Sequence, residues 1–251
     1  MSKGNTPKLP EFILNYDGLK VPSGDDGKDA EWVNAFSPKY LGSEVKRLYA
    51  TETLFGDWDA EILLLAQDAL PAAALTNLIN SNLSNGLTRE SAWRHADRVK
   101  FGDKKGWKTN ETIKSLMDKY APNQKALYGS AAAHMLYSDG GLDYRQDLLG
   151  FKHPSLTAHL VQVLNWVVKN MHNLRLIMCL GEHAWRISNE AAMAGGTKKF
   201  VQYRNDGRVL DVLIEGRHIT LVPAFHPMAI KTNHEKERSW KLLSEALSKF
   251  G

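Results

Sequence analysis

Two residues that could take part in hydrolysis follow apolar segments of the chain. Asp68 comes shortly after the apolar run at residues 60–65, and His226 comes directly after the run at residues 219–225. A carboxylate can orient a water molecule for attack, and an imidazole can stabilise negative charge that develops on a leaving group. Spacing alone supports this weakly, because an aspartate after a strand is commonly a turn residue and a histidine before proline is commonly structural. The pair predicts a hydrolytic site if both segments end at one edge of a sheet.

Other chemistries that sequence motifs can reveal fit this chain less well. No glycine-rich dinucleotide loop follows a strand-like segment, and neither a GxxxxGK[S/T] phosphate loop nor a GxSxG nucleophile elbow is present. The nine histidines show no metal-ligand spacing. The single cysteine, Cys179, excludes a disulfide, a zinc ribbon and a cysteine-held iron–sulfur cluster within one chain. We therefore expect catalysis without a metal or another cofactor.

The elements that would position Asp68 and His226 follow from apolar periodicity. Strand-like runs occupy residues 60–65, 126–136, 174–180 and 219–225, and a hairpin-like stretch at 209–218 precedes the last run. Segments with the helical period occupy residues 112–120, 153–171, 185–193 and 237–250. This alternation predicts a single α/β domain with a central, mostly parallel four-stranded sheet and helices on both faces. Ligands of such folds bind beyond the carboxyl ends of the strands.

The composition sets the class of protein. Of the 251 residues 43% are hydrophobic, which suits an α/β domain over residues 31–251 after a partly irregular arm over residues 1–30. We expect a cytoplasmic protein, because no apolar run approaches the roughly 18 residues of a membrane span, no secretory pattern opens the chain and cysteine is rare. The net charge of +4, with six Lys or Arg between Arg94 and Lys108, permits a nucleic-acid partner without requiring one.

Four segments in chain order carry a further pattern. They are Ala-Gln-Asp-Ala-Leu-Pro at residues 66–71, Phe-Gly-Asp at 101–103 with Asn-Glu-Thr-Ile at 110–113, Leu-Gly-Glu-His-Ala at 180–184, and His-Pro-Met-Ala-Ile at 226–230. Their order and strand context resemble the uracil-DNA glycosylase superfamily, where Gly-Gln-Asp-Pro-Tyr-His opens the site and His-Pro-Ser-Pro-Leu closes it. Over about residues 58–250 the chain is similar to a divergent Ung-like member.

The resemblance implies a role for the candidate catalytic residues in hydrolysing the N-glycosidic bond of uracil. Asp68 would position the attacking water and stabilise the cationic sugar, while His226 would donate a hydrogen bond to uracil O2 as charge accumulates there. The backbone N–H of Gln67 would help to hold the same oxygen. Phe101 would stack on the flipped base.

Two uracil-binding positions depart from the family pattern. Leu70 stands where the family has a tyrosine that excludes the methyl group of thymine, and an aliphatic side chain could still block that methyl. The asparagine that reads the uracil edge falls on Ala133 or His134, and His134 could hydrogen-bond O4 or N3.

The implied DNA contacts come from the final motif and the basic stretch. Ile230 best matches the apolar wedge that fills the vacated base stack, with Met228 as second choice. Met228 also replaces the serine that usually grips a DNA phosphate. Lys104 and Lys105, which follow Phe101 closely, would contact phosphates and make binding dependent on salt.

The resulting hypothesis is a monomeric base-excision-repair glycosylase that removes uracil from single- or double-stranded DNA and leaves an abasic site. Two alternatives stay open. One is a protein that binds damaged or abasic DNA with little catalysis, and the other is an α/β hydrolase of small N-glycosides.

Overall fold

The computed structural model of the chain describes residues 7, 10–14, 19–21, 30–34, 55–66, 86, 108–130, 134–137, 154–192, 199–225 and 233–250. The helices are α1 (Glu11–Leu14), α6 (Lys108–Tyr120), α8 (Pro154–Asn170), α9 (Glu182–Ala191), α10 (Phe200–Asp206) and α11 (Asn233–Leu247). The strands are β1 (Leu19–Val21), β2 (Ala30–Asn34), β3 (Phe55–Gly56), β4 (Ile62–Ala66), β5 (Ala126–Ser130), β6 (His134–Tyr137), β7 (Leu176–Leu180), β8 (Leu210–Ile214) and β9 (Arg217–Ala224).

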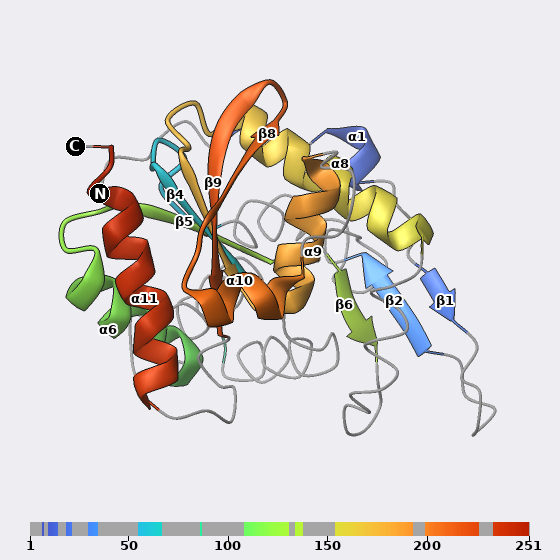
Figure 1. Cartoon of the computed structure of the whole chain (residues 1–251). Helices are drawn as coiled ribbons and strands as arrows, with labels where there is room; N and C mark the ends of the chain where they lie inside the picture. Colours follow the sequence, from blue (N-terminus) through green and yellow to red (C-terminus); the bar gives the residue numbers. More distant parts are fainter. Residues whose placement is uncertain are drawn as a thin grey trace.

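A six-stranded sheet of order β3-β5-β4-β7-β9-β8 lies at the centre of the described structure (Figure 1). The four inner strands β5, β4, β7 and β9 are parallel. The edge strands β3 and β8 are antiparallel to their neighbours. The fold is therefore α/β with a mixed sheet. The predicted four parallel strands form its centre, and one antiparallel strand on each side extends it to six.

Helices pack on both faces of this sheet because the inner strands are apolar on both sides. Leu63 and Leu65 of β4 belong to a core cluster with side chains of α8, α9 and α10. Ile62 and Leu64 of the same strand belong to a second cluster with side chains of α6 and α11. Every residue of β7 is buried. Burial on both faces explains the near-continuous apolar runs, and the predicted coverage by helices on both faces is confirmed.

The amphipathic segments and the hairpin are also confirmed. The four segments with helical period form α6, α8, α9 and α11, and Pro154 opens α8, where its missing N–H leaves no bond unmade. β8 and β9 form the hairpin across Glu215 and Gly216, whose φ angles are 52° and 72°. Two successive left-handed residues match the twist of paired strands, which is why this turn type closes short hairpins.

The prediction of a single strand over residues 126–136 is wrong. β5 ends at Ser130 and β6 begins at His134, and β6 pairs with β2 in a separate antiparallel sheet of order β1-β2-β6. Apolar periodicity shows that a segment is extended, but it does not show where the chain leaves one sheet for another. The segment predicted as a partly irregular arm contains α1 and β1.

Across the described ranges, none of the helices combines the length and the apolar character that a membrane span needs.

Candidate functional site

The four parallel strands end level with one another at the carboxyl edge of the sheet. Ala66 pairs with Ser130, so β4 and β5 end together. Leu180 pairs with Ala224, so β7 and β9 end together. Leu65 pairs with Cys179, one residue before the ends of β4 and β7. The last residues of all four strands therefore form one row across the sheet.

The strand order also reverses at this edge. From β4 the chain moves to one side to form β5 and then crosses to the other side to form β7 and β9. In an open α/β sheet, this reversal leaves a crevice between the loops that follow the two central strands, and ligands bind there. In this sheet the reversal lies between β4 and β7, and β9 is the neighbour of β7 on the other side. The topology thus favours a site above β4, β7 and β9.

Most of the predicted site residues lie outside the described residues. They are Gln67, Asp68, Leu70, Phe101, Lys104, Lys105, His226, Met228 and Ile230. Asp68 and His226 nevertheless each follow a described strand end by two residues, because β4 ends at Ala66 and β9 ends at Ala224. The strands that precede these two residues in the chain, β4 and β9, end at the same edge of the sheet, with β7 between them.

His134 is the one predicted site residue whose backbone is described. It begins β6 and pairs with Asn34 of β2 in the small sheet. It therefore does not extend β5, as the prediction of a single strand over 126–136 implied. Its side chain lies outside the described residues, and its contact with uracil stays a prediction.

Gly181 ties the end of β7 to the end of β9. Its N–H lies 2.9 Å from the carbonyl oxygen of Ala224 and 3.0 Å from that of Cys179. Its φ of 114° is in the region that favours glycine, and α9 begins at the next residue. The Leu-Gly-x-x-Ala match at residues 180–184 marked this position in the sequence. The structure adds its role, which is to turn the chain sharply at the candidate edge.

Phe225, the residue that precedes His226, is held by Arg204 of α10. The guanidinium carbon of Arg204 lies 4.0 Å from the centroid of the Phe225 ring and 5.3 Å from that of Phe200. Arg204 Nε is buried and makes no hydrogen bond within the described part of the chain. Burial lowers the pKa of Arg204, and nearby Glu235 and Glu182 favour its charged form. A cation over an aromatic ring is attracted by the electron density of the ring face. No sequence signal pointed to this contact.

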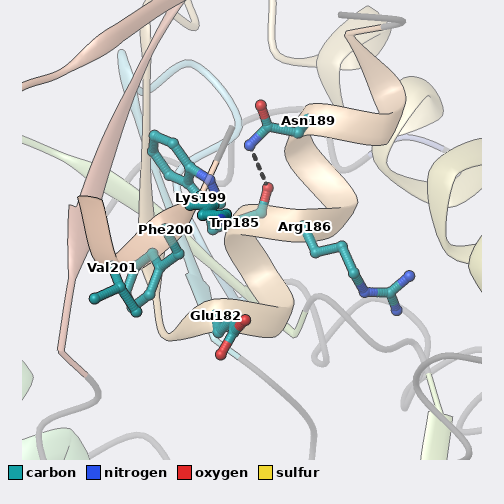
Figure 2. A pocket seen from close by; sticks show the side chains of 7 residues that line it. All are labelled: Glu182, Trp185, Arg186, Asn189, Lys199, Phe200 and Val201. Atoms are coloured by element: carbon teal, nitrogen blue, oxygen red, sulfur yellow. Dashed lines mark hydrogen bonds between the residues drawn. The ribbon is translucent and has the colours of Figure 1, made fainter. Parts of the chain in front are cut away.

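A pocket opens beside this contact, between α9 and α10 (Figure 2). Its volume is about 380 Å³, and its lining residues are Glu182, Trp185, Arg186, Asn189, Lys199, Phe200 and Val201. The four residues from α9 recur at helical spacing, so they share one face of that helix. The pocket belongs to the same edge of the sheet, since α9 starts immediately after Gly181. Sequence reasoning did not identify it.

Metal chemistry receives no support from the described residues, where His, Cys, Asp and Glu form no group of three able to hold an ion.

Comparison with models of known protein families gives no match, and comparison with curated protein sequences gives none either.

Proposed function

We propose that this protein is a uracil-DNA glycosylase, a monofunctional enzyme that hydrolyses the N-glycosidic bond of uracil in DNA. The strongest support for the proposal is the place of two sequence motifs in the fold. The two segments that resemble the opening and closing motifs of the superfamily follow β4 and β9, which end level at one sheet edge on either side of β7. A water-orienting carboxylate and a charge-stabilising imidazole are needed on opposite sides of one glycosidic bond, and this topology suits such a pair.

The proposed reaction starts with extrusion of the uracil nucleotide from the DNA, which is stabilised by a fitted pocket for the base. Phe101 stacks on the uracil ring, Leu70 blocks the methyl group of thymine, and His134 forms a hydrogen bond with O4 or N3 of uracil. Ile230, with Met228 as the second choice, fills the space that the base leaves in the stack. Lys104 and Lys105 bind phosphates of the strand.

Hydrolysis then breaks the bond from deoxyribose C1′ to uracil N1. Positive charge develops on the sugar, where Asp68 stabilises it and orients the water that attacks C1′. Negative charge develops on uracil O2, where His226 and the N–H of Gln67 donate hydrogen bonds. The oxygen of the water bonds to C1′, and the proton that the water gives up ends on the departed uracil. The products are free uracil and an abasic site, and no cofactor takes part.

The test uses a labelled oligonucleotide with one uracil, single- or double-stranded, incubated with the pure protein in the presence of a chelator. Heating in alkali converts abasic sites into strand breaks. We expect cleavage at the uracil position in the wild type. The nearly isosteric Asp68→Asn variant should lower the rate by at least about a hundredfold, the scale of one positioned acid–base group, and should still bind DNA in a gel shift.

Three other results of these assays would contradict the proposal or the role of Asp68. Excision by Asp68→Asn at close to the wild-type rate would remove Asp68 from its role. Tight, salt-sensitive DNA binding without release of uracil would replace the proposal by a protein that binds damaged or abasic DNA. Release of uracil from free deoxyuridine, but from no oligonucleotide, would replace it by a small-molecule N-glycoside hydrolase.

A further inference from the structure

The pocket between α9 and α10 is lined by Asn189, whose side chain is only partly hydrogen-bonded within the described part of the chain. Asn189 is only 3% exposed, and its Nδ2 donates to the carbonyl oxygen of Trp185 at 2.9 Å (Figure 2). Its Oδ1 is buried and accepts no hydrogen bond within the described part of the chain. A buried acceptor without a donor costs roughly 1–3 kcal/mol. A ligand that brings an N–H or O–H group would remove this cost.

The lining of the pocket carries two positive charges and one negative charge, and Glu190 outside the lining also lies near Arg186. Arg186 and Lys199 are cations, and Glu182 is the one acidic residue of the lining. Arg186 is partly buried, and its Nη1 donates to Thr157 Oγ1 at 2.9 Å, which fixes the guanidinium beside the pocket. Lys199 is exposed at the other side. Glu182 can accept a hydrogen bond from a sugar hydroxyl or a base amine.

Apolar surface completes the lining. The Trp185 and Phe200 rings pack with their centroids 6.0 Å apart and form the inner wall. Val201 is 47% exposed, which is unusual for a large aliphatic side chain in the described structure. A flat ring system laid against this surface would cover it. The volume of about 380 Å³ falls in the range of small-molecule sites.

We infer that the α9–α10 pocket binds a nucleoside phosphate. This class combines a flat ring with N–H donors for Asn189 Oδ1, an anionic group for Arg186 and Lys199, and a size that suits the pocket. The choice of occupant rests on the proposed function, because that function brings DNA to the edge where α9 begins. The nucleoside phosphate is either a nucleotide of the bound strand, next to the one that is hydrolysed, or a free nucleotide.

The experiment measures binding by calorimetry with two kinds of probe. One is the set dAMP, dCMP, dGMP and TMP, and the other is a single-stranded oligonucleotide without uracil. The variants Lys199→Gln and Asn189→Leu each remove one proposed contact, and thermal unfolding checks that both are folded. Lys199 is exposed, so its replacement leaves the core untouched. The matched control is Lys169→Gln, an exposed lysine in the last turn of α8, at the opposite edge of the sheet.

Both pocket variants should weaken binding about tenfold, the effect of losing one hydrogen bond to a charged or buried group, while Lys169→Gln should bind as the wild type does. Loss for mononucleotides as well as the oligonucleotide identifies a free nucleotide as a ligand. Loss for the oligonucleotide alone identifies a nucleotide of the strand. Wild-type affinity in both pocket variants, or no binding of either probe to the wild type at millimolar concentration, overturns the inference.

Uracil release by the same proteins separates this inference from the proposed function. Nucleotide binding that depends on Lys199 and Asn189, in a protein that releases no uracil, would leave the pocket assigned and the glycosylase proposal refuted. Uracil release by a protein whose nucleotide binding neither substitution affects would support the glycosylase proposal and refute the assignment of the pocket.

Discussion

Cys179 and His159 are buried side chains whose proton affinity differs strongly from that of a solvated group. Burial raises the pKa of the Cys179 thiol to about 12, although the hydrogen bond to Ser188 lowers it somewhat. Burial lowers the pKa of His159 to about 4. At neutral pH the cysteine is therefore a protonated thiol and the histidine a neutral ring. Both are buried, Cys179 next to the end of β7 and His159 on α8, where they serve packing.

His159 makes stability depend on pH. Its unfolded pKa is about 6.5 and its folded pKa about 4, so the unfolded chain takes up a proton that the folded chain resists. Stability from the neutral ring is present above pH 6.5 and is lost as the pH falls toward 4, by up to about 3 kcal/mol. We expect the difference in unfolding free energy between wild type and His159→Gln, measured in urea, to shrink over that window. The exposed His218→Gln is the control. A difference that stays constant with pH would contradict this role.

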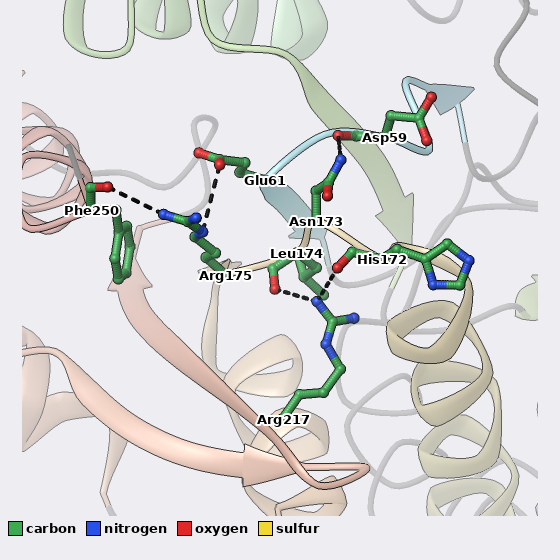
Figure 3. Close-up of polar contacts among 8 residues, drawn as sticks. All are labelled: Asp59, Glu61, His172, Asn173, Leu174, Arg175, Arg217 and Phe250. Atoms are coloured by element: carbon green, nitrogen blue, oxygen red, sulfur yellow. Dashed lines mark hydrogen bonds and ion pairs between the residues drawn. The ribbon is translucent and has the colours of Figure 1, made fainter.

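At the scale of elements, Arg217 joins the end of α8 to the start of β9. Its Nη1 donates to the carbonyl oxygens of Val168 and Met171 at 2.6 and 2.7 Å. Its Nη2 donates to those of His172 and Leu174 at 2.8 and 2.7 Å (Figure 3). Carbonyls at the end of a helix lack partners within the helix and carry partial negative charge, which a cation stabilises. One guanidinium thus fixes the turn that leads into β7 at the amino edge of the sheet.

Replacing Arg217 by methionine keeps much of the side-chain length but removes every donor. We expect a loss of about 2–4 kcal/mol of unfolding free energy, since one carbonyl in the last turn of α8 and three in the turn that follows lose a cationic donor. Arg217→Lys should recover only part of the loss, because an ammonium group cannot reach four acceptors in fork geometry. Urea denaturation measures both variants against Lys169→Gln, which removes an exposed ion pair and should cost at most about 1 kcal/mol. A loss for Arg217→Met no larger than that of the control would show that water replaces the guanidinium.

Elements with double-sided burial could be predicted from sequence, whereas pairing could not. The apolar runs gave β4, β7 and β9, because strands buried on both faces need apolar residues at every position. The level ending of these strands, which carries the candidate site, depends on register and had no signal in the sequence. The position of His134 in a second sheet was missed for the same reason. The contact of Arg204 with Phe225 was missed because it joins segments that lie apart in the chain. Asn189 was missed because helical periodicity does not show which buried side-chain atom lacks a hydrogen bond.

At the scale of the whole molecule, β4 connects the two halves of the core. Its residues alternate between the cluster under α8, α9 and α10 and the cluster under α6 and α11. Because β4 contributes side chains to both clusters, unfolding of one cluster displaces the strand on which the other cluster also packs. The inner strands and the helices on both faces should therefore unfold as one cooperative unit.

Neighbouring residues of β4 offer the test of this cooperativity. Leu63 and Leu64 are 0% and 1% exposed and face opposite clusters. Replacing either by alanine leaves a cavity, and we expect each variant to lose about 2–5 kcal/mol. Urea unfolding followed by circular dichroism and by tryptophan fluorescence should give one coincident transition in both, shifted to lower urea. Leu213→Ala, at a position 52% exposed on β8, should lie close to wild type. Separate transitions for the two probes in either core variant would mean that the two faces of the sheet unfold independently.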